Sequence, residues 1–171
     1  MNTTANKITL LRIILIPAFL LLLYCQRTGW AFLVFVAACV SDALDGYIAR
    51  RYDQISTFGK FVDPLADKML VLSAMCWFIR SGQMEAWVVA AVLFREFAVS
   101  GLRLIAAEKK IVIAATLSGK LKTICTMVCL GAMILFPRLD LVNIISSCLI
   151  LIVTLGSGID YFIANKTVFS D

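Results

Sequence analysis

The chain has 171 residues, of which 61% are hydrophobic and only 16% are charged, and its mean hydropathy is +0.94. A soluble domain of this length would have about half apolar and about a quarter charged residues, so the composition excludes an ordinary soluble domain and indicates an integral membrane protein. The formal net charge is +5. We attribute this excess to anionic lipid headgroups and membrane topology rather than to nucleic acid.

Six apolar runs of roughly 20 residues follow one another, each long enough to cross a bilayer as a helix. They cover residues 8–25, 30–49, 61–79, 86–107, 116–136 and 140–163. Because they use nearly the whole chain, the sequence predicts an all-α integral membrane protein: one domain, residues 1–171, that is a bundle of six transmembrane helices. No small-residue cleavage site follows the first run, which predicts a retained helix rather than a signal peptide.

Lys and Arg are distributed unevenly over the predicted connections. The N-terminal segment, the second and fourth connections and the C-terminal end are basic, whereas the others carry only Arg27, Arg80 and Arg138. By the positive-inside rule, both termini face the cytoplasm, and so does the connection between the second and third runs. We therefore expect a multi-pass protein of the cell inner (cytoplasmic) membrane with its polar residues on the cytoplasmic side.

Four aspartates interrupt the apolar pattern where the second run ends and the third begins. Asp42 and Asp45 are three residues apart, and Asp63 and Asp67 are four apart, so each pair projects from one face of a helix. The short polar connection between the runs makes the two helices antiparallel neighbours. Four carboxylates are thereby brought together, and they would raise one another's pKa unless cations neutralised them.

The donor set of this cluster indicates a hard cation. It contains only carboxylate oxygens, and the chain has no histidine, so Mg²⁺ or Mn²⁺ is favoured over Zn²⁺. Two ions roughly 3.5–4 Å apart could share the four side chains and clamp a phosphoryl group. The alternative is a divalent-cation transporter, but a transporter would place its ligands near the bilayer midplane on broken helices. These aspartates instead lie at one interface, beside Arg50 and Lys60.

Small and basic residues accompany the aspartates. Gly46 and Ala49 leave space in which a bulky ligand can approach the backbone, although small residues also serve close helix packing. Arg50 can pair with a phosphate or extend to lipid headgroups. Pro64 is compatible with the first turn of a helix, which predicts that Asp63 lies at or near a helix N-terminus, where the dipole favours an anion.

Eight positions of this region form a recognisable pattern. They are Asp42, Asp45, Gly46, Ala49, Arg50, Gly59, Asp63 and Asp67. The pattern resembles the signature of the CDP-alcohol phosphotransferase family, and every fixed position is filled. The resemblance implies that a CDP-linked lipid binds with its pyrophosphate on two metal ions, Mg²⁺ or Mn²⁺, that an alcohol attacks the lipid-side phosphorus, and that CMP leaves.

The same resemblance implies individual roles. Asp42, Asp45 and Asp63 would be metal ligands, and Asp67 would be both a ligand and the base that takes the hydroxyl proton. The CDP site would be formed by the small and basic positions Gly46, Ala49, Arg50 and Gly59.

Upstream, Asn6, Thr9 and Arg12 resemble the stretch that opens the first helix in these enzymes, so Asn6 and Thr9 are added to the CDP site. The alternative for this stretch is a helix cap with an interfacial anchor. A homodimer is also implied by the family resemblance.

A second polar group follows on the fourth and fifth runs. It comprises Arg95, Glu96, Ser100, Gly101, Arg103, Ser118, Gly119, Lys120, Lys122 and Thr123. An acceptor alcohol that carries its own phosphate needs such cations. We therefore expect Arg103, Ser118, Lys120 and Lys122 to bind the acceptor phosphate. The alternative is that these cations only set the membrane topology.

The order of these residues resembles the glycerol-3-phosphate branch of the family. That branch implies transfer of the phosphatidyl group from CDP-diacylglycerol to sn-glycerol 3-phosphate, which yields phosphatidylglycerol phosphate and CMP in phospholipid biosynthesis. Inositol phosphate, serine and phosphatidylglycerol remain alternative acceptors. The six cysteines form no Cys-x-x-Cys pair, and we interpret them as structural residues rather than ligands.

Overall fold

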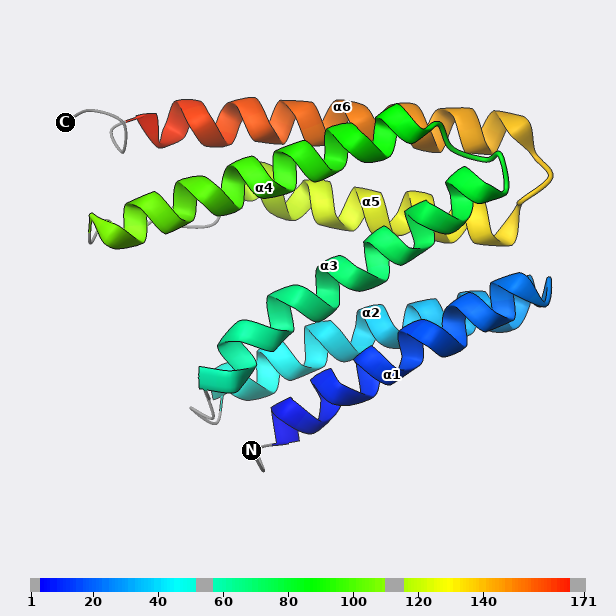
Figure 1. The fold of residues 1–171 in the computed structure, drawn as a ribbon, viewed down its shortest axis with the longest axis horizontal. Coiled ribbons are helices and arrows are strands. Elements are labelled where there is room, and N and C mark those ends of the chain that lie inside the picture. The colour runs from blue at the N-terminus through cyan, green and yellow to red at the C-terminus, as the bar shows by residue number, and fades with distance from the viewer. Residues whose placement is uncertain (1–3, 52–56, 110–115, 167–171) are drawn as a thin grey trace.

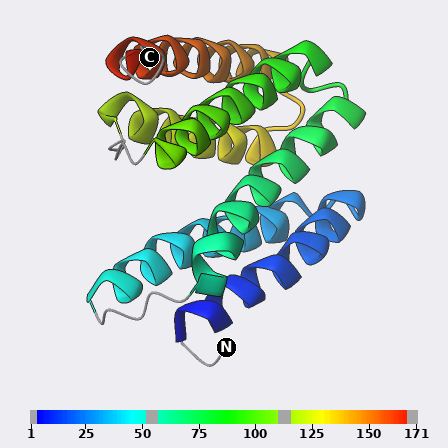
Figure 2. The same cartoon turned by 60° about the vertical axis from the view of Figure 1, so that its left-hand side comes forward.

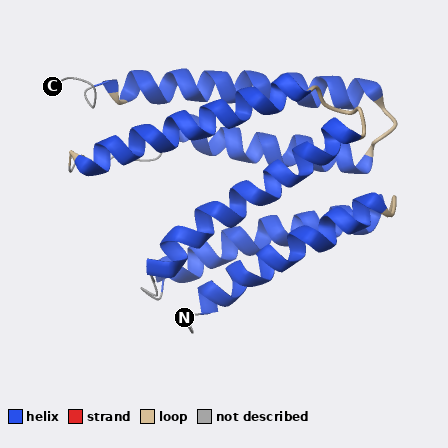
Figure 3. Ribbon diagram, viewed as in Figure 1, coloured by secondary structure: helices blue, strands red, loops and turns tan. Residues whose placement is uncertain are grey.

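Six helices make up the described part of the chain, and the view in Figure 1 follows them from end to end. The computed structural model describes the backbone of residues 4–51, 57–109 and 116–166. Side chains are described for residues 10–41, 65–66, 68–109 and 116–166. Within these ranges there is no strand, as Figure 3 shows, so the predicted all-α class is confirmed.

Each predicted apolar run corresponds to one helix. The helices are α1 (Thr4–Tyr24), α2 (Thr28–Arg51), α3 (Thr57–Arg80), α4 (Ala86–Glu108), α5 (Leu117–Leu135) and α6 (Asp140–Ala164). The largest differences are at the start of α1 and of α3, which each begin four residues before the predicted run. Here the polar flanking residues continue the helix, because hydrogen bonding along a helix does not depend on hydrophobicity.

One local prediction was wrong. The helix α3 begins at Thr57, so Asp63 lies in its second turn rather than at or near its N-terminus. A proline removes a single N–H from the hydrogen-bond ladder, and membrane helices tolerate this loss because the residues on either side can remain helical. Pro64 therefore does not mark the start of α3, just as Pro17 lies inside α1.

The six helices form two groups connected by α3. In Figures 1 and 2, α1 and α2 pair on one side, α4, α5 and α6 assemble on the other, and α3 crosses diagonally between them. Contacts of α3 with α1, α4 and α5, and of α5 with α2, connect the groups. Because successive helices run in opposite directions, the two termini lie at the same end, here called the terminal end (Figure 1).

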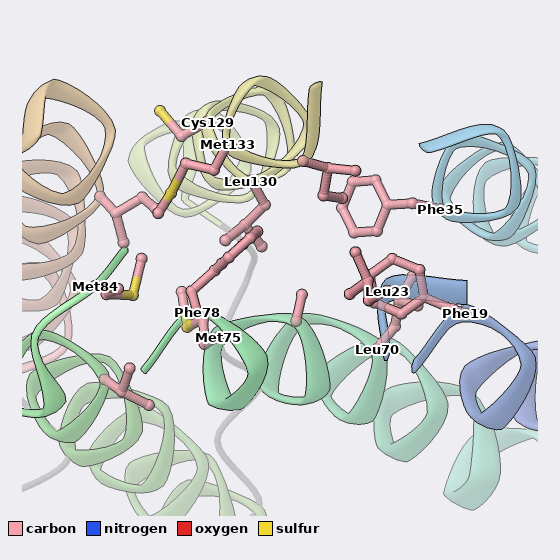
Figure 4. Close-up of a cluster of buried hydrophobic side chains, with 14 of the residues drawn as sticks. Phe19, Leu23, Phe35, Leu70, Met75, Phe78, Met84, Cys129, Leu130 and Met133 are labelled. Atoms are coloured by element: carbon pink, nitrogen blue, oxygen red, sulfur yellow. The ribbon is translucent and has the colours of Figure 1, made fainter. Parts of the chain in front are cut away.

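The hydrophobic core occupies the half of the molecule away from the termini. Phe19 of α1 and Phe35 of α2 contact each other with ring centroids 5.7 Å apart, and Leu130 of α5 is fully buried nearby. Figure 4 shows how side chains from several helices converge on this cluster. The turn between α3 and α4 lies at this end, and in it Gly82 adopts a φ of +72°. The side-chain amide of the neighbouring Gln83 donates from Nε2 to the carbonyl of Met133 on α5 at 3.1 Å.

The outer surface is apolar and part of the interior is polar. On α6, the apolar residues Ile144, Ile152, Ile159 and Ile163 are all more than 60% exposed. Polar residues of the same helix are buried, namely Asn143, Ser146, Thr154 and Ser157. A soluble monomer rarely exposes so large an apolar surface, so this arrangement fits a lipid environment. By length and composition, α5 and α6 are sufficiently apolar to cross a membrane.

Candidate acceptor cavity and metal site

The aspartate-bearing segments come together at the terminal end. Asp42 and Asp45 are in the last turns of α2, Asp63 and Asp67 are in the first half of α3, and the two helices contact each other. The side chains of these four aspartates lie outside the described residues. Their roles as metal ligands, and that of Asp67 as the base, therefore stay predictions.

The predicted CDP-binding positions share that terminal end. Their side chains also lie outside the described residues, which applies to Asn6, Thr9, Gly46, Ala49, Arg50 and Gly59. Helix α1, which carries the first two, contacts both α2 and α3. The backbone therefore brings all three segments to one region, and the assignments of the individual residues remain predictions.

Arg12 connects this region to the described interior. Its side chain is fully buried, and its Nε donates to Ser41 Oγ at 3.4 Å. Ser41 directly precedes Asp42, so a cation of α1 lies against the aspartate-bearing part of α2. A buried guanidinium requires compensation by polar or charged groups. This location fits the predicted participation of the start of α1 in the site.

A cavity of about 460 Å³ opens between α3, α4, α5 and α6 in the half of the molecule that carries the aspartates. Its polar wall carries five cations: Lys68, Arg95, Arg103, Lys120 and Lys122. Glu96 is the one carboxylate among the lining residues that the structure describes. Leu65, Met69 and Phe97 belong to its apolar wall. Such a cavity can accept an anionic group at its polar wall.

Three of the four predicted acceptor-phosphate residues line this cavity together: Arg103, Lys120 and Lys122. Ser118 is not among the lining residues. Its hydroxyl donates instead to the carboxylate of Asp160 on α6. The structure thus brings the three cations together and shows Ser118 in a contact between α5 and α6.

Glu96 is the centre of the charge network. Its Oε1 accepts hydrogen bonds from Lys122 Nζ at 2.7 Å and from Arg95 Nη1 at 3.0 Å. Its Oε2 lies 3.6 Å from Lys68 Nζ, which also donates to Ser100 Oγ at 2.8 Å. The carboxylate is 19% exposed and the Lys122 side chain 9%. These partly buried ion pairs link α3, α4 and α5 and are screened less by solvent than surface pairs.

Arg103 is oriented by Tyr161. Its Nε donates to Tyr161 Oη at 2.9 Å, and its guanidinium lies 5.6 Å from the centre of the tyrosine ring. Tyr161 is 1% exposed and packs with Val99 and Leu102. Tyr161 therefore connects α6 to a cation of α4. Only Nε of the Arg103 guanidinium donates to Tyr161, so its two Nη atoms do not take part in this hydrogen bond.

A glycine of α6 makes room for Arg95. A Cβ on Gly158 would lie 3.1 Å from Arg95 Cγ, which is tighter than an ordinary contact. Two buried polar atoms, Arg95 Nε and Thr126 Oγ1, have no hydrogen-bond partner among the described residues. Buried polar atoms are normally paired. Both residues line the cavity, so a polar ligand or water there would satisfy them.

Sequence reasoning missed Lys68 and the central position of Glu96. Lys68 directly follows Asp67, and the predicted role of this aspartate already explains why the segment is polar. The sequence therefore gave no separate reason to assign a role to Lys68. Its spacing offered one signal, because a lysine one residue from the aspartate stripe projects toward a neighbouring face of α3. In the sequence, Glu96 stands among several cations, and that pattern alone assigns it no role. Its pairing with a lysine 26 residues away depends on how α4 and α5 are both placed against α6.

The donor chemistry at the aspartate-bearing ends fits a divalent metal ion. In the described parts of the chain there is no group of three or more metal-ligating side chains, and the four aspartates lie outside those parts. Contact between α2 and α3 brings together two segments whose acidic residues offer oxygen ligands only. This set suits Mg²⁺ or Mn²⁺.

The profile of the CDP-alcohol phosphatidyltransferase family matches residues 2–158. The chain belongs to this family of enzymes, which is membrane-associated and generally depends on divalent metal ions. Membership sets aside the transporter alternative, because the family transfers phosphatidyl groups.

Several bacterial relatives are similar over most of the chain. The CDP-diacylglycerol–glycerol-3-phosphate 3-phosphatidyltransferase of Bacillus subtilis is 36% identical, over 94% of this chain and 93% of its own length. The enzyme of the same name from Rickettsia typhi is 35% identical, over 99% of this chain and 100% of its own. A probable phosphatidylglycerophosphate synthase of Mycobacterium tuberculosis is 36% identical, over 92% of this chain and 78% of its own.

Proposed function

We propose that the protein transfers the phosphatidyl group from CDP-diacylglycerol to sn-glycerol 3-phosphate, which yields phosphatidylglycerol phosphate and CMP. The proposal is supported by the relatives, whose names state this reaction. The observation that carries the choice of acceptor is the cavity lined by five cations. A phosphorylated acceptor uses such a wall, whereas serine or another acceptor without a phosphate monoester does not.

The aspartates supply the metal site and the base. Asp42, Asp45, Asp63 and Asp67 are proposed to hold two Mg²⁺ or Mn²⁺ ions, which when bound neutralise the pyrophosphate and polarise the phosphoryl group. Asp67 accepts the proton of the attacking hydroxyl. A bond forms between that hydroxyl oxygen and the lipid-side phosphorus, and the bond from this phosphorus to the CMP oxygen breaks.

The CDP moiety is proposed to bind at the terminal ends of α1 and α2. Gly46 and Ala49 leave room for cytidine beside the aspartates, and Arg50 and Gly59 border the pyrophosphate. Asn6 and Thr9 complete this site from α1. The support is the family signature together with the contacts that α1 makes with α2 and α3.

The acceptor is proposed to lie in the cavity with its reacting hydroxyl toward α3. Lys68 lines the cavity and is the neighbour of Asp67 along α3, so this side of the cavity is near the proposed base. Arg103, Lys120 and Lys122 are proposed to bind the acceptor phosphate. Ser118 contributes through its contact with Asp160, which joins α5 to α6 beside these cations.

All six helices are proposed to span the cell inner (cytoplasmic) membrane as one domain of residues 1–171, with both termini and the active site on the cytoplasmic side. The apolar exterior and the uneven distribution of Lys and Arg support this topology. We further propose a homodimer by analogy with the family. Single cysteines introduced near Lys60 or Arg138, in a background without native cysteines, test the topology with an impermeant thiol reagent. Labelling near Lys60 in intact cells would contradict it.

An acceptor panel tests the reaction. Purified protein is supplied with CDP-diacylglycerol and Mg²⁺, and CMP release is measured with glycerol 3-phosphate, inositol phosphate, serine or phosphatidylglycerol. We expect efficient release only with glycerol 3-phosphate, and identification of the lipid product by mass spectrometry confirms the transfer. Preferential use of another alcohol would refute the acceptor assignment while leaving the family unaffected.

A further inference from the structure

We propose that Glu96 is a positioning and selectivity residue of the acceptor cavity. It holds Lys122 and Lys68 in fixed positions on the wall and thereby directs the acceptor phosphate to the place where Lys122 meets Arg103 and Lys120, two cations that Glu96 does not compensate. It also disfavours acceptors that carry a second negative charge near the reacting hydroxyl. This inference deepens the proposed function and rests on it.

The contacts of Glu96 support the positioning role. Its Oε1 accepts hydrogen bonds from Lys122 Nζ at 2.7 Å and from Arg95 Nη1 at 3.0 Å, and Lys68 Nζ lies 3.6 Å from its Oε2. Lysine and arginine side chains have many rotamers, and holding them in one geometry before the ligand arrives reduces the entropy that binding must overcome. Glu96 therefore orders cations from three helices around one point of the cavity wall.

The distribution of charge along the cavity wall indicates where the acceptor phosphate binds. Three of the five lining cations have Glu96 as an acidic partner. Arg103 is held by the neutral Tyr161, and Lys120 has no acidic partner among the described residues. An incoming dianion is attracted most strongly where positive charge is not already compensated. That location is the part of the cavity between α4 and α5 that carries Arg103 and Lys120.

The position of Lys68 indicates how the acceptor is oriented in the cavity. Because Lys68 follows Asp67 on α3 and also contacts Glu96, the Glu96 side of the cavity is the side of the proposed base. The uncharged, hydroxyl-bearing carbons of glycerol phosphate then lie near Glu96. A phosphorylated hydroxy acid would bring a carboxylate to the same place, where repulsion from Glu96 acts against it.

The test compares Glu96→Gln, which removes the charge at constant size, with Glu96→Asp, which keeps the charge. Glu108→Gln is the matched control, because Glu108 is an exposed carboxylate of the same helix and does not line the cavity. For each variant, CMP release gives kcat and KM for glycerol 3-phosphate. The inhibition constants of inorganic phosphate and of 3-phosphoglycerate are measured in the same assay.

For Glu96→Gln we expect two changes of opposite direction. The kcat/KM for glycerol 3-phosphate falls by about tenfold or more, the size of one lost charge-assisted hydrogen bond. The inhibition constants of phosphate and 3-phosphoglycerate decrease, with the larger decrease for 3-phosphoglycerate, because an anion has been removed from the wall. Glu96→Asp restores the parental ranking of the two inhibitors, and Glu108→Gln behaves as the parent.

Equal or weaker inhibition of Glu96→Gln by both anions would overturn the inference and leave Glu96 with a purely structural role. If Glu96→Gln does not fold, Glu96→Asp decides, because it keeps the charge on a shorter side chain that cannot hold Lys122 and Lys68 in the same geometry. Reduced kcat/KM with the parental inhibitor ranking supports the inference, and a changed ranking overturns it. The acceptor panel on the parent protein is a separate readout. A parent that prefers another alcohol refutes the proposed function, whereas the response of the anion inhibitors to Glu96→Gln still reports on the positioning role.

Discussion

The two halves of the molecule differ in what fills them. Away from the termini, side chains such as Phe19, Phe35 and Leu130 pack into a continuous apolar core. At the terminal end, a cavity is lined by five cations and a carboxylate. Helix α5 takes part in both: Lys122 and Thr126 line the cavity, and one turn beyond Thr126, Leu130 is buried in the core.

This difference separates stability from ligand binding along the helix axes. The packed half contributes dispersion and tight fit. The half with the cavity keeps charges that are costly to bury, and two of its buried polar atoms lack a partner within the described residues. Because the two halves share helices, the packed half can hold the cavity walls in place while the cavity remains open to a ligand. Changes in the two halves should therefore have different consequences.

The largest effect is expected from removing the metal ion. Excess chelator should abolish CMP release, and Mg²⁺ or Mn²⁺ should restore it, because the four aspartates cannot hold a pyrophosphate without cations. The packed half should not respond, so the thermal unfolding midpoint in detergent is measured alongside activity. Full turnover in excess chelator would contradict the proposed metal site.

Next in size is the loss of the proposed base. Asp67→Asn keeps the size of the side chain but cannot accept a proton, so turnover should fall by about 10²–10⁴ while CDP-lipid binding largely survives. Asp140→Asn is the control, because Asp140 is an exposed aspartate at the start of α6, in the half away from the cavity. Parental turnover of Asp67→Asn would remove Asp67 from its assigned role.

The packed half is tested on the same helix. Leu130→Ala should lower the free energy of unfolding by about 2–5 kcal/mol, because it leaves a void in the core, and should leave the KM of the acceptor unchanged. Thr126→Val should do the reverse, since the Thr126 hydroxyl has no partner among the described residues. For Thr126→Val we expect an unchanged free energy of unfolding and a raised KM for the acceptor. A similar loss of stability in both variants would contradict the separation of the two halves.

The cations of the cavity should affect only the acceptor. Arg103→Ala, Lys120→Ala and Lys122→Ala each remove one charge-assisted contact of about 1.5–3 kcal/mol, roughly a ten- to hundredfold loss of kcat/KM for glycerol 3-phosphate. The apparent affinity for CDP-diacylglycerol should change much less. Lys166→Ala is the control, because Lys166 is exposed and does not line the cavity. Normal use of glycerol phosphate by all three variants would assign these cations to topology alone.

The smallest effect is expected from crowding Arg95. Gly158→Ala places a Cβ 3.1 Å from Arg95 Cγ, whereas Gly156→Ala meets nothing within 4 Å. An off-rotamer side chain costs about 0.5–1.5 kcal/mol, so acceptor kcat/KM should fall roughly two- to tenfold in Gly158→Ala. Gly156→Ala should retain the parental value. Equal activities would show that the orientation of Arg95 does not influence acceptor use.

Local features of the sequence were sufficient for the helices and for the position of the aspartates. An apolar run of bilayer length determines one helix at a time, and all six were predicted within a few residues. The spacing of Asp42, Asp45, Asp63 and Asp67 was recognisable because it lies within two adjacent helices. The exception is the start of α3: Pro64 predicts a first helical turn, but membrane helices tolerate an interior proline and α3 begins seven residues earlier, at Thr57.

The tertiary structure decided which polar side chains meet. The sequence predicted Arg103, Lys120 and Lys122 as a group, but it could not show that Glu96 bridges Lys122 and Lys68, or that Ser118 contacts Asp160. These pairs join residues on different helices, and their distances depend on the diagonal crossing of α3 and on the packing of α4 and α5 against α6. Periodicity determines the face on which a residue lies, whereas the partner on that face depends on how whole helices pack.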